Sequence, residues 1–226
     1  MDQLATPARI FNTQQQTLCR PVSGQFNTDA VYEKHFDQGN FNISLRLLCI
    51  NTDINFIYDW VNQDYARRFW QMDGHTPTQL KELYHNIAQS DFAQSFVALL
   101  NNNPVCQLDI YHAMRDEVGT LYNARRGDYG IHLIMAPRQK TIAGLSGYVL
   151  QTFLEYFFSC EEVDRIIGEP DAENQGANKL VTKLGFQFRR KINMSYKTAN
   201  LYTCTRTNLQ TAIQQNQYSA NTPLCA

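Results

Sequence analysis

Two apolar segments, each with polar side chains at one end and joined by a predicted amphipathic helix, constrain the fold of this chain most. Segment 129–135 contains His132, and segment 164–169 leads into a polar loop that contains Asp171. Both have the length and apolar content of buried strands, and the helix 145–159 separates them. In a strand–helix–strand unit, both carboxyl ends emerge at one edge of the sheet, where open α/β sheets bind ligands. We therefore expect His132 and Asp171 to face one crevice.

The order of the other elements indicates the fold class. The pattern predicts, in chain order, strand 41–50, a helix from an N-cap at Asp53 toward residue 70, helix 78–89 after Thr76-Pro77, strands 95–100 and 105–113, strand 129–135, helix 145–159, strand 164–169, helix 175–184 capped by Gly185, and strands 186–196 and 200–206. This order predicts an α/β (α+β) fold with a mixed, mostly antiparallel sheet flanked by helices. One right-handed parallel crossover is expected within it.

The two ends of the chain differ from its middle. Residues 1–40 are rich in Gln, Asn and Thr without a sustained period, so we expect an N-terminal extension with at most one short strand or helix. Residues 41–206 form the predicted domain, and the Gln/Asn-rich residues 207–226 are expected to be a frayed tail. A chain of 226 residues accommodates one domain plus such an extension.

Composition narrows the function classes. Twenty basic and 21 acidic side chains leave a formal charge of −1, which gives no electrostatic reason to expect nucleic acid or a membrane as partner. No run of about 18 apolar residues is present, and the start of the chain lacks a secretory pattern. The six cysteines form no Cys-x-x-Cys pair, so we expect reduced thiols, no metal site and a cytoplasmic protein.

The segment before helix 145–159 is a candidate phosphate site. Unpaired N–H groups at a helix N-terminus lie at the positive end of the helix dipole and suit an anion. Arg138 and Lys140 add positive charge, and Gly144 permits close approach to the backbone. Neither a P-loop nor a Rossmann glycine pattern is present. The alternative is an ordinary connection between a strand and a helix.

His132, Asp171 and Asn174 are candidate site residues, each with a structural alternative. A histidine has a pKa of about 6.5 and can accept a proton near neutral pH, although a histidine inside an apolar strand is more often a hydrogen-bonded core residue. Asp171 could accept a proton or orient a substrate group, or it could cap the next turn. Asn174 could contact a ligand, or it could cap helix 175–184.

Asp109, Trp70 and Tyr111 are the candidates for binding a substrate. Asp109 interrupts an apolar strand, where a carboxylate is costly to bury unless it is paired or faces a cavity. A cationic amine would be a natural partner for it. The alternative places Asp109 on the solvent face of its strand. Trp70 and Tyr111 supply aromatic surface for the same substrate.

Four segments together carry a resemblance to a known family. They are Ala66-Arg-Arg-Phe-Trp70, Asp128-Tyr-Gly-Ile-His132-Leu, Glu169-Pro-Asp-Ala-Glu-Asn174 and Leu184-Gly-Phe186. In this order and spacing, over residues 41–206, the chain resembles the GNAT N-acetyltransferases, which use acyl-CoA to acylate amines. Within that superfamily it is most similar to the siderophore-biosynthesis branch, with its aerobactin, alcaligin, rhizobactin and mycobacterial lysine acyltransferases.

The resemblance implies a GNAT fold, with splayed parallel fourth and fifth strands, and a role for each candidate residue. His132 and Asp171 would line the acceptor site and assist deprotonation of the attacking nitrogen, and Asp109 would hold the amine. Asn174 would lie near the pantetheine. A backbone N–H of the fourth strand, at Leu133, Ile134 or Met135, would polarise the thioester carbonyl. The CoA pyrophosphate would be held by loop 138–144, at Arg138, Gln139, Lys140, Ile142, Ala143 and Gly144.

One position departs from the family pattern. The superfamily loop is Gln/Arg-x-x-Gly-x-Gly/Ala, and the best register here is Gln139-Lys-Thr-Ile142-Ala-Gly144. Ile142 therefore replaces the first glycine, which affects the detailed geometry of the pyrophosphate site. Backbone N–H groups make the contacts in such a loop, so a side chain at this position does not by itself prevent binding.

The sequence therefore predicts an acyl-CoA-dependent N-acyltransferase. Its acceptor would be an amine or N-hydroxyamine of a diamine or lysine-like siderophore precursor, and its cosubstrate acetyl-CoA or another acyl-CoA. We expect no metal, no nucleic acid or membrane partner, and a monomer or homodimer. Two alternatives stay open: an aminoglycoside-type N-acetyltransferase and a non-catalytic CoA-binding module.

Overall fold

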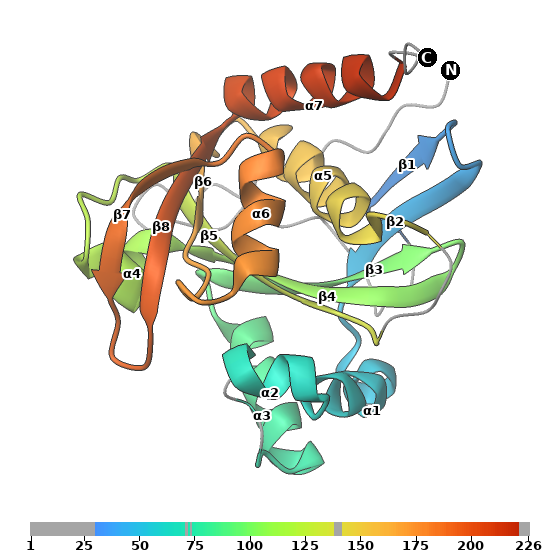
Figure 1. Ribbon diagram of the computed structural model, residues 1–226. Helices are drawn as coiled ribbons and strands as arrows, with labels where there is room; N and C mark the ends of the chain where they lie inside the picture. The colour runs from blue at the N-terminus through green and yellow to red at the C-terminus, as the bar shows by residue number, and fades with distance from the viewer. Residues whose placement is uncertain (1–29, 71, 73, 138–141, 222–226) are drawn as a thin grey trace.

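An eight-stranded sheet forms the centre of the molecule, in the strand order β1-β2-β3-β4-β5-β6-β8-β7 (Figure 1). The computed structural model describes residues 30–70, 72, 74–137 and 142–221. The strands are β1 (Tyr32–Phe36), β2 (Phe41–Leu47), β3 (Ala93–Leu100), β4 (Asn103–His112), β5 (Asp128–Met135), β6 (Arg165–Gly168), β7 (Gln187–Asn193) and β8 (Thr198–Thr205). β5 and β6 pair in parallel and all other neighbours pair antiparallel, which confirms the predicted mixed sheet.

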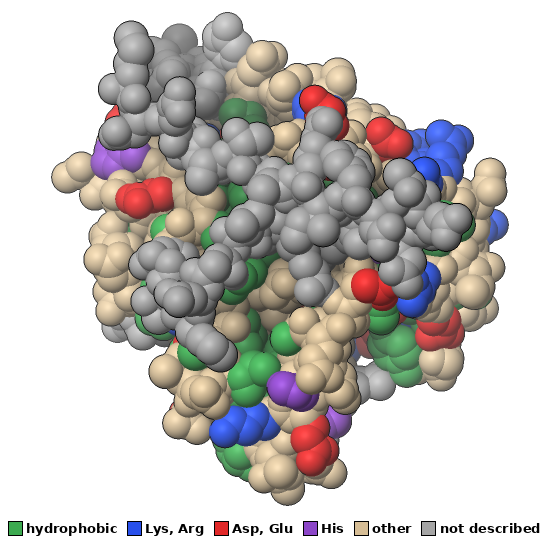
Figure 2. Space-filling view, turned by 180° about the vertical axis from the view of Figure 1, so that it is seen from behind, with side chains coloured by type: hydrophobic (Ala, Val, Ile, Leu, Met, Phe, Trp, Pro, Cys, Tyr) green, Lys and Arg blue, Asp and Glu red, His purple; other side chains and the backbone are tan. Residues whose placement is uncertain are grey.

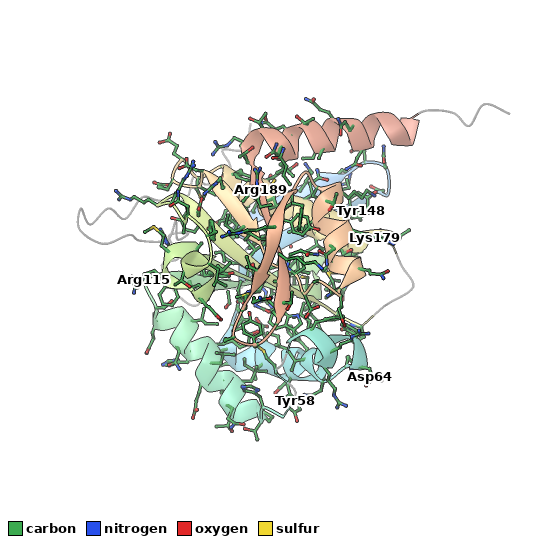
Figure 3. The ribbon with its side chains drawn as sticks, turned by 60° about the vertical axis from the view of Figure 1, so that its left-hand side comes forward. Tyr58, Asp64, Arg115, Tyr148, Lys179 and Arg189 are labelled. Atoms are coloured by element: carbon green, nitrogen blue, oxygen red, sulfur yellow. The ribbon has the colours of Figure 1, made fainter. Side chains whose placement is uncertain are left out.

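Helices cover both faces of this sheet. They are α1 (Ile50–Val61), α2 (Asp64–Trp70), α3 (Pro77–Gln89), α4 (Glu117–Thr120), α5 (Leu145–Phe158), α6 (Gln175–Lys183) and α7 (Arg206–Asn221), with a 3-10 turn η1 (Ala113–Arg115) before α4. Figure 1 shows α5, α6 and α7 on one side of the sheet and α1 to α3 on the other. The view turned by 60° shows the same two layers (Figure 3).

The larger core lies between α5 and the sheet. α5 buries an apolar stripe that includes Leu150, Phe153 and Phe157 at helical spacing. Phe96 of β3 meets both phenylalanines edge to face, with ring centroids 5.8 Å and 5.4 Å away. On the other face, Ile57 of α1 and Leu80 of α3 lie in a second buried cluster. The strand–helix–strand unit is thus held on both sides.

The helix that starts after β2 differs from its prediction. α1 begins at Ile50, so Asp53 lies in its first turn and is not the N-cap. The buried Arg46 explains this placement, because its guanidinium is 2.6 Å from Asp53 Oδ2. The same carboxylate accepts the Cys49 N–H at 2.8 Å, which stabilises the start of the helix from inside. The predicted run to residue 70 is two helices, α1 and α2.

The two ends of the chain compare differently with their predictions. The short strand expected in the N-terminal extension is β1, which pairs antiparallel with β2. Residues 206–221 form α7, so the prediction of a frayed tail is wrong for them. Leu209 and Ala212 of this helix are buried, and apolar burial stabilises a helix of otherwise weak propensity. Residues 1–29 and 222–226 lie outside the described residues.

The predicted helix ends are confirmed at two positions. Thr76 forms a capping box with Gln79, and Pro77 occupies the first turn of α3. Gly185, after α6, has a φ of +87°, and a Cβ there would overlap the backbone of Asn208. Glycine is therefore required at this position by both conformation and space.

Several findings concern the described residues alone. In that part of the chain Cys106, Cys160 and Cys204 are buried free thiols, and Cys49 is a partly exposed one. No described helix has the length and apolar character needed to cross a membrane. Within the same residues no group of three metal-binding side chains occurs. On the face seen in Figure 2, the drawn basic side chains occur in small groups with acidic ones among them.

Candidate active site

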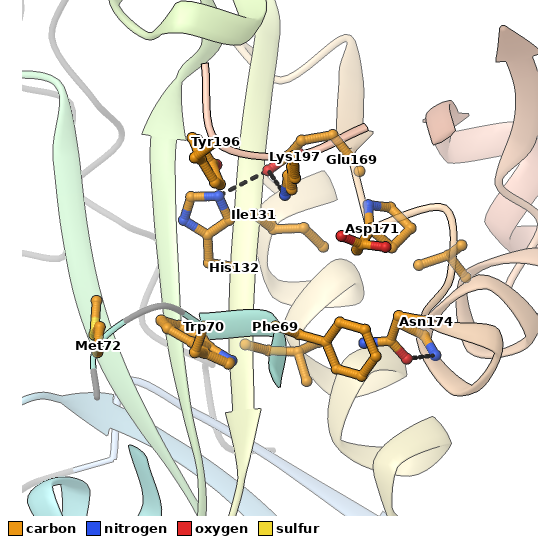
Figure 4. A pocket seen from close by; sticks show the side chains of 15 residues that line it. Phe69, Trp70, Met72, Ile131, His132, Glu169, Asp171, Asn174, Tyr196 and Lys197 are labelled. Atoms are coloured by element: carbon orange, nitrogen blue, oxygen red, sulfur yellow. Dashed lines mark hydrogen bonds and ion pairs between the residues drawn. The ribbon is translucent and has the colours of Figure 1, made fainter. Parts of the chain in front are cut away.

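A cavity opens where the two parallel strands separate. The β5–β6 ladder ends at the pair Gly130↔Ile167, although β5 continues to Met135. The cavity has a volume of about 390 Å³ and is lined by residues of α2, β5, the end of β6, the β6–α6 loop and the β7–β8 turn (Figure 4). His132 and Asp171 both line it, so the structure brings together the two residues expected to share a crevice.

The backbone of β5 presents alternate residues to this gap. Ala136 N–H donates to Val105 O at 2.8 Å, and Ile134 lies opposite Gln107 in the β4–β5 register. Because hydrogen-bonded and non-hydrogen-bonded pairs alternate in an antiparallel ladder, Leu133 and Met135 turn their N–H and C=O groups away from β4. Ile134 turns its groups toward β4 and buries its side chain under the α1–α3 layer, so it does not reach the gap.

One of the backbone groups at this edge already has a side-chain partner. The Tyr65 hydroxyl of α2 donates to the carbonyl oxygen of Met135 at 2.7 Å. The same helix places Phe69 and Trp70 along the cavity. α2 therefore borders the gap. Leu133, the residue after His132, has its backbone N–H turned into the gap.

His132 and Glu169 form a close pair at the base of the gap. His132 Nε2 lies 2.7 Å from Glu169 Oε1, and the carboxylate is only 1% exposed, compared with 36% for the imidazole. Burial alone would lower the pKa of His132, but the charge and hydrogen bond of Glu169 outweigh it, so that this pKa is raised. Burial alone would raise the pKa of Glu169, and the charge and hydrogen bond of His132 reverse this effect and lower it.

Two aromatic rings fix the imidazole from its sides. Trp70 meets it edge to face at a centroid distance of 6.2 Å, and Tyr111 lies 4.9 Å away. Tyr111 crosses the sheet opposite Gly130, and a Cβ at Gly130 would overlap its ring. Burial and the charge of Glu169 raise the pKa of Tyr111 well above its usual value. Tyr111 was predicted to bind substrate, but it packs behind His132 and does not line the cavity.

Lys197 adds a cation to the same corner. It comes from the turn between β7 and β8, and its ammonium is 3.9 Å from Glu169 Oε1, with the side chain 11% exposed. It also lies over the ring of its neighbour Tyr196, 5.2 Å from the centroid. Figure 4 shows His132 and Lys197 directed at one oxygen of Glu169. This carboxylate therefore has two cationic or partly cationic neighbours.

In the loop after β6, Asp171 and Asn174 line the cavity and also make hydrogen bonds that stabilise the loop. Asp171 Oδ1 accepts the Glu173 N–H at 2.7 Å, and Asn174 Oδ1 accepts the Ala177 N–H at 3.0 Å as the N-cap of α6. Asn178 fastens this loop to β8: its amide donates to Asp171 O at 2.8 Å, and its Oδ1 accepts from Asn200 at 2.7 Å. The capping alternative is thus confirmed for both residues, and both still line the cavity.

Asp109, which was predicted to hold the substrate amine, lies behind the cavity. It is buried opposite His132 in the β4–β5 register, but it is absent from the cavity lining. Ser95 donates to its Oδ1 at 2.5 Å, and Gln107 donates to the same oxygen at 2.7 Å. Burial raises the pKa of Asp109, and these hydrogen bonds oppose the shift. Neighbouring polar side chains therefore satisfy this buried carboxylate, so the structure gives no support to its predicted contact with an amine.

The start of α5 suits a phosphate group at the positions that the structure describes. Gly144 is the N-cap with a φ of +76°, and the first turn of α5 contains no acidic residue. The Ile142 side chain packs against the main core, while Ala143 and Gly144 are exposed. The predicted contacts of Arg138, Gln139 and Lys140 lie outside the described residues. The open edge of β5 and the N-terminus of α5 each have the backbone N–H groups that an acyl-CoA would need.

Two charged residues of the cavity were missed from the sequence. Glu169 belongs to the Glu-Pro-Asp segment, and its place at a strand end beside the strand of His132 was the available signal. Lys197 lies in a short polar turn that carries no pattern of its own. Only the pairing of β8 with β6 brings that turn to Glu169.

A mixed sheet whose parallel strands separate over a cavity with a histidine–carboxylate pair defines the class of acyl-CoA-dependent N-acyltransferases. Within that class, the chain belongs to the GNAT acetyltransferases, since residues 49–194 match the model of the acetyltransferase (GNAT) domain.

Two curated relatives have named activities. The N-hydroxyputrescine acetyltransferase of Acinetobacter baumannii is 23% identical over 163 residues, which cover 72% of this chain and 77% of that protein. The lysine N-acyltransferase MbtK of Mycolicibacterium paratuberculosis is 22% identical over 151 residues, or 66% of this chain and 68% of that protein.

Solved structures support the fold. An uncharacterized protein from Bacillus halodurans superposes with a TM-score of 0.77 at 20% identity, over 81% of this chain and 94% of that one. The aminoglycoside acetyltransferase AAC(6')-Ib, in complex with paromomycin and acetyl-CoA, gives a TM-score of 0.67 at 23% identity, over 74% and 96%. At these identities the likeness concerns the fold alone.

Proposed function

We propose that this enzyme transfers an acyl group, in the first instance acetyl, from acyl-CoA to an amine or N-hydroxyamine of a diamine or lysine-like siderophore precursor. The observation that carries the proposal is the His132–Glu169 pair at the point where β5 and β6 separate. The names of the two curated relatives, which act on N-hydroxyputrescine and on lysine, support the acceptor class. Acyl-CoA is an intracellular cosubstrate, so the proposal includes a cytoplasmic location.

In this proposal His132 is the proton acceptor. When the imidazole is neutral and its Nε2–H donates to Glu169, the lone pair is on Nδ1. The acceptor nitrogen attacks the thioester carbonyl carbon and loses one proton to the imidazole. The C–N bond forms, the C–S bond breaks, and CoA leaves as a thiolate that is protonated when the imidazole is regenerated. General base catalysis of this kind contributes about 100-fold or more.

The remaining groups align the two substrates. The N–H of Leu133, turned into the gap, would polarise the thioester carbonyl, and the start of α5 would hold the pyrophosphate. Asp171 has one oxygen engaged with the Glu173 N–H, and the carboxylate lines the cavity, where it would orient a polar group of the acceptor. The thioester is already activated, so alignment supplies several kcal/mol of the catalysis.

The test is CoA release from acetyl-CoA with N-hydroxyputrescine and N6-hydroxylysine as acceptors. We expect turnover by the wild type and a large loss in His132→Ala and Asp171→Ala. His85→Ala is the matched control, because this exposed histidine of α3 does not line the cavity and bonds only to Gln89 in the described chain. Full turnover in both site variants would show that the site assignment is wrong.

One second candidate is an aminoglycoside N-acetyltransferase, because the cavity is lined by two carboxylates. Glu169 and Asp171 are the carboxylates that line the cavity. Glu173 is paired with Arg68 at 2.9 Å, and Asp109 is not part of the lining, so neither adds to the acidic surface of the cavity. A resistance assay in a sensitive host separates the two activities. A non-catalytic CoA-binding module, the third alternative, would bind acetyl-CoA in calorimetry and show no turnover with any acceptor.

A further inference from the structure

Lys197 has no evident role in the reaction as described so far, yet it occupies the reacting corner of the cavity. Its ammonium and His132 Nε2 approach the same oxygen, Glu169 Oε1, at 3.9 Å and 2.7 Å. The side chain is largely buried, so solvent screens its charge weakly. A hydrogen bond from this ammonium to a described residue is not found. Its charge therefore lies beside the His132–Glu169 pair.

The charged groups around that space are unevenly distributed. β5 contributes His132, the end of β6 contributes Glu169, and the β7–β8 turn contributes Lys197. α2 contributes the aromatic residues Phe69 and Trp70 to the lining, and no charged side chain. The single carboxylate at the reacting corner thus faces both the imidazole and the ammonium. Asp171 lies along the loop after β6 and supplies the second carboxylate of the cavity.

This arrangement disfavours a protonated amine at the attacking position. An alkylamine has a pKa of about 10.4, so only about one molecule in 1,000 is neutral near pH 7.4. A site with an unpaired carboxylate would bind the ammonium form and then remove its proton. Here Glu169, the carboxylate nearest His132, is already neutralised by Lys197, and a like charge within about 4–6 Å disfavours a second cation at that position. An N-hydroxyamine is largely neutral at this pH and meets no such penalty.

We propose that Lys197 is a specificity-determining residue that makes the acceptor site select N-hydroxyamines over the corresponding primary amines. The inference rests on the proposed function and deepens it. The names of the two relatives do not decide between the acceptors, since one is an N-hydroxyputrescine acetyltransferase and the other a lysine N-acyltransferase. The inference also places the reaction in a sequence: an N-hydroxylating monooxygenase must supply the acceptor before acylation. The product is then a hydroxamate, formed with release of free CoA.

The experiment compares a matched acceptor pair, putrescine and N-hydroxyputrescine, with acetyl-CoA as donor. Steady-state kcat and KM are measured for the wild type, Lys197→Met, which keeps the length of the side chain without its charge, and Lys197→Arg, which keeps the charge. We expect the wild type to favour N-hydroxyputrescine by about 100-fold or more in kcat/KM. Lys197→Met should lower KM for putrescine about tenfold and change kcat/KM for N-hydroxyputrescine less than about threefold. Lys197→Arg should keep the wild-type ratio.

Each other outcome has a defined meaning. An unchanged ratio in Lys197→Met, or equal losses on both acceptors, would overturn the role of Lys197 and leave the proposed function intact. A wild type that prefers putrescine would overturn the inference without any variant. No turnover of either acceptor, nor of the lysine and N6-hydroxylysine pair, would overturn the proposed function itself. If Lys197→Met does not fold by circular dichroism, Lys197→Gln carries the same expectation.

Discussion

The two sides of the cavity are built in different ways. On the proposed acceptor side, His132 is held in place by other side chains: Glu169, Trp70 and Tyr111. On the proposed cosubstrate side, the groups that would contact acyl-CoA are backbone groups, at the open edge of β5 and at the start of α5. If these assignments hold, substitutions should act strongly on the first side and weakly on the second. Under the same proposal, an isoleucine can replace the glycine of the family pattern without loss of cosubstrate binding.

The largest expected effect is the loss of the proton acceptor. His132→Ala should reduce kcat by about 100-fold to 10,000-fold with N-hydroxyputrescine, because general base catalysis contributes that range. KM for acetyl-CoA should change little, since the cosubstrate contacts lie on backbone groups. CoA release under saturating substrates measures both values. If kcat of His132→Ala stays within threefold of the wild-type value, the acceptor side of the cavity does not depend on this side chain, and the comparison with the cosubstrate side fails.

The partner of the imidazole should have the next largest effect. Glu169→Gln keeps the shape and one hydrogen-bond acceptor but removes the charge that stabilises the imidazolium. We expect kcat near pH 9 to fall about tenfold, because the ring keeps its neutral form and loses part of its orientation. Glu173→Gln, a change at an exposed carboxylate of the adjoining loop, is the control and should leave kcat unchanged. Equal effects of the two substitutions would contradict the proposed role of Glu169.

A packing change tests the support of the site without touching a reacting group. Gly130→Ala would drive a Cβ into the Tyr111 ring, so we expect a loss of about 1–3 kcal/mol in the free energy of unfolding and a lower kcat. Gly147→Ala on α5 is the matched control, since nothing lies within 4 Å of its added Cβ. Thermal unfolding of both variants measures the difference. If both lose equal stability, the Tyr111 contact is not the cause.

The smallest effect is expected on the cosubstrate side. Ile142→Gly restores the family glycine, and we expect KM for acetyl-CoA to change less than about threefold, because backbone N–H groups make the phosphate contacts. The packing of Ile142 against the core should appear instead as a small loss of thermal stability. Initial rates at varied acetyl-CoA measure the first quantity. A tenfold tighter KM would show that the isoleucine side chain obstructs the cosubstrate.

Much of the fold could be predicted from the sequence, because alternation, helical spacing and turn residues are local signals. The strands around His132 and the helix after Thr76 are examples, since their patterns need no tertiary contact. α7 could not be predicted in this way, because its polar composition is outweighed by burial of Leu209 and Ala212 against the rest of the chain. The first turn of α1 was misplaced for a similar reason, since the Arg46–Asp53 pair joins it to β2.

The part of the candidate site that lies at strand ends could be predicted from the sequence. His132 and Asp171 meet at one cavity because parallel strands bring their carboxyl ends together. The surroundings of Asp109 could not be predicted, because the sequence does not show that Ser95 and Gln107 donate hydrogen bonds to its carboxylate. The place of Lys197 in the cavity could not be predicted from the sequence, for a different reason. A turn between two late strands comes to the site only through the order β6-β8-β7.

The most direct test of the central claim, that an imidazole paired with Glu169 takes the proton of the acceptor nitrogen, is the acid limb of the pH profile of kcat/KM. The pKa of His132 is raised in the folded protein, so the wild type should gain activity with increasing pH through a midpoint above the usual value of about 6.5. Removing the carboxylate charge removes the cause of the shift. In Glu169→Gln the midpoint should therefore fall toward the usual value with the same acceptor. Identical acid limbs in the two proteins would contradict the account.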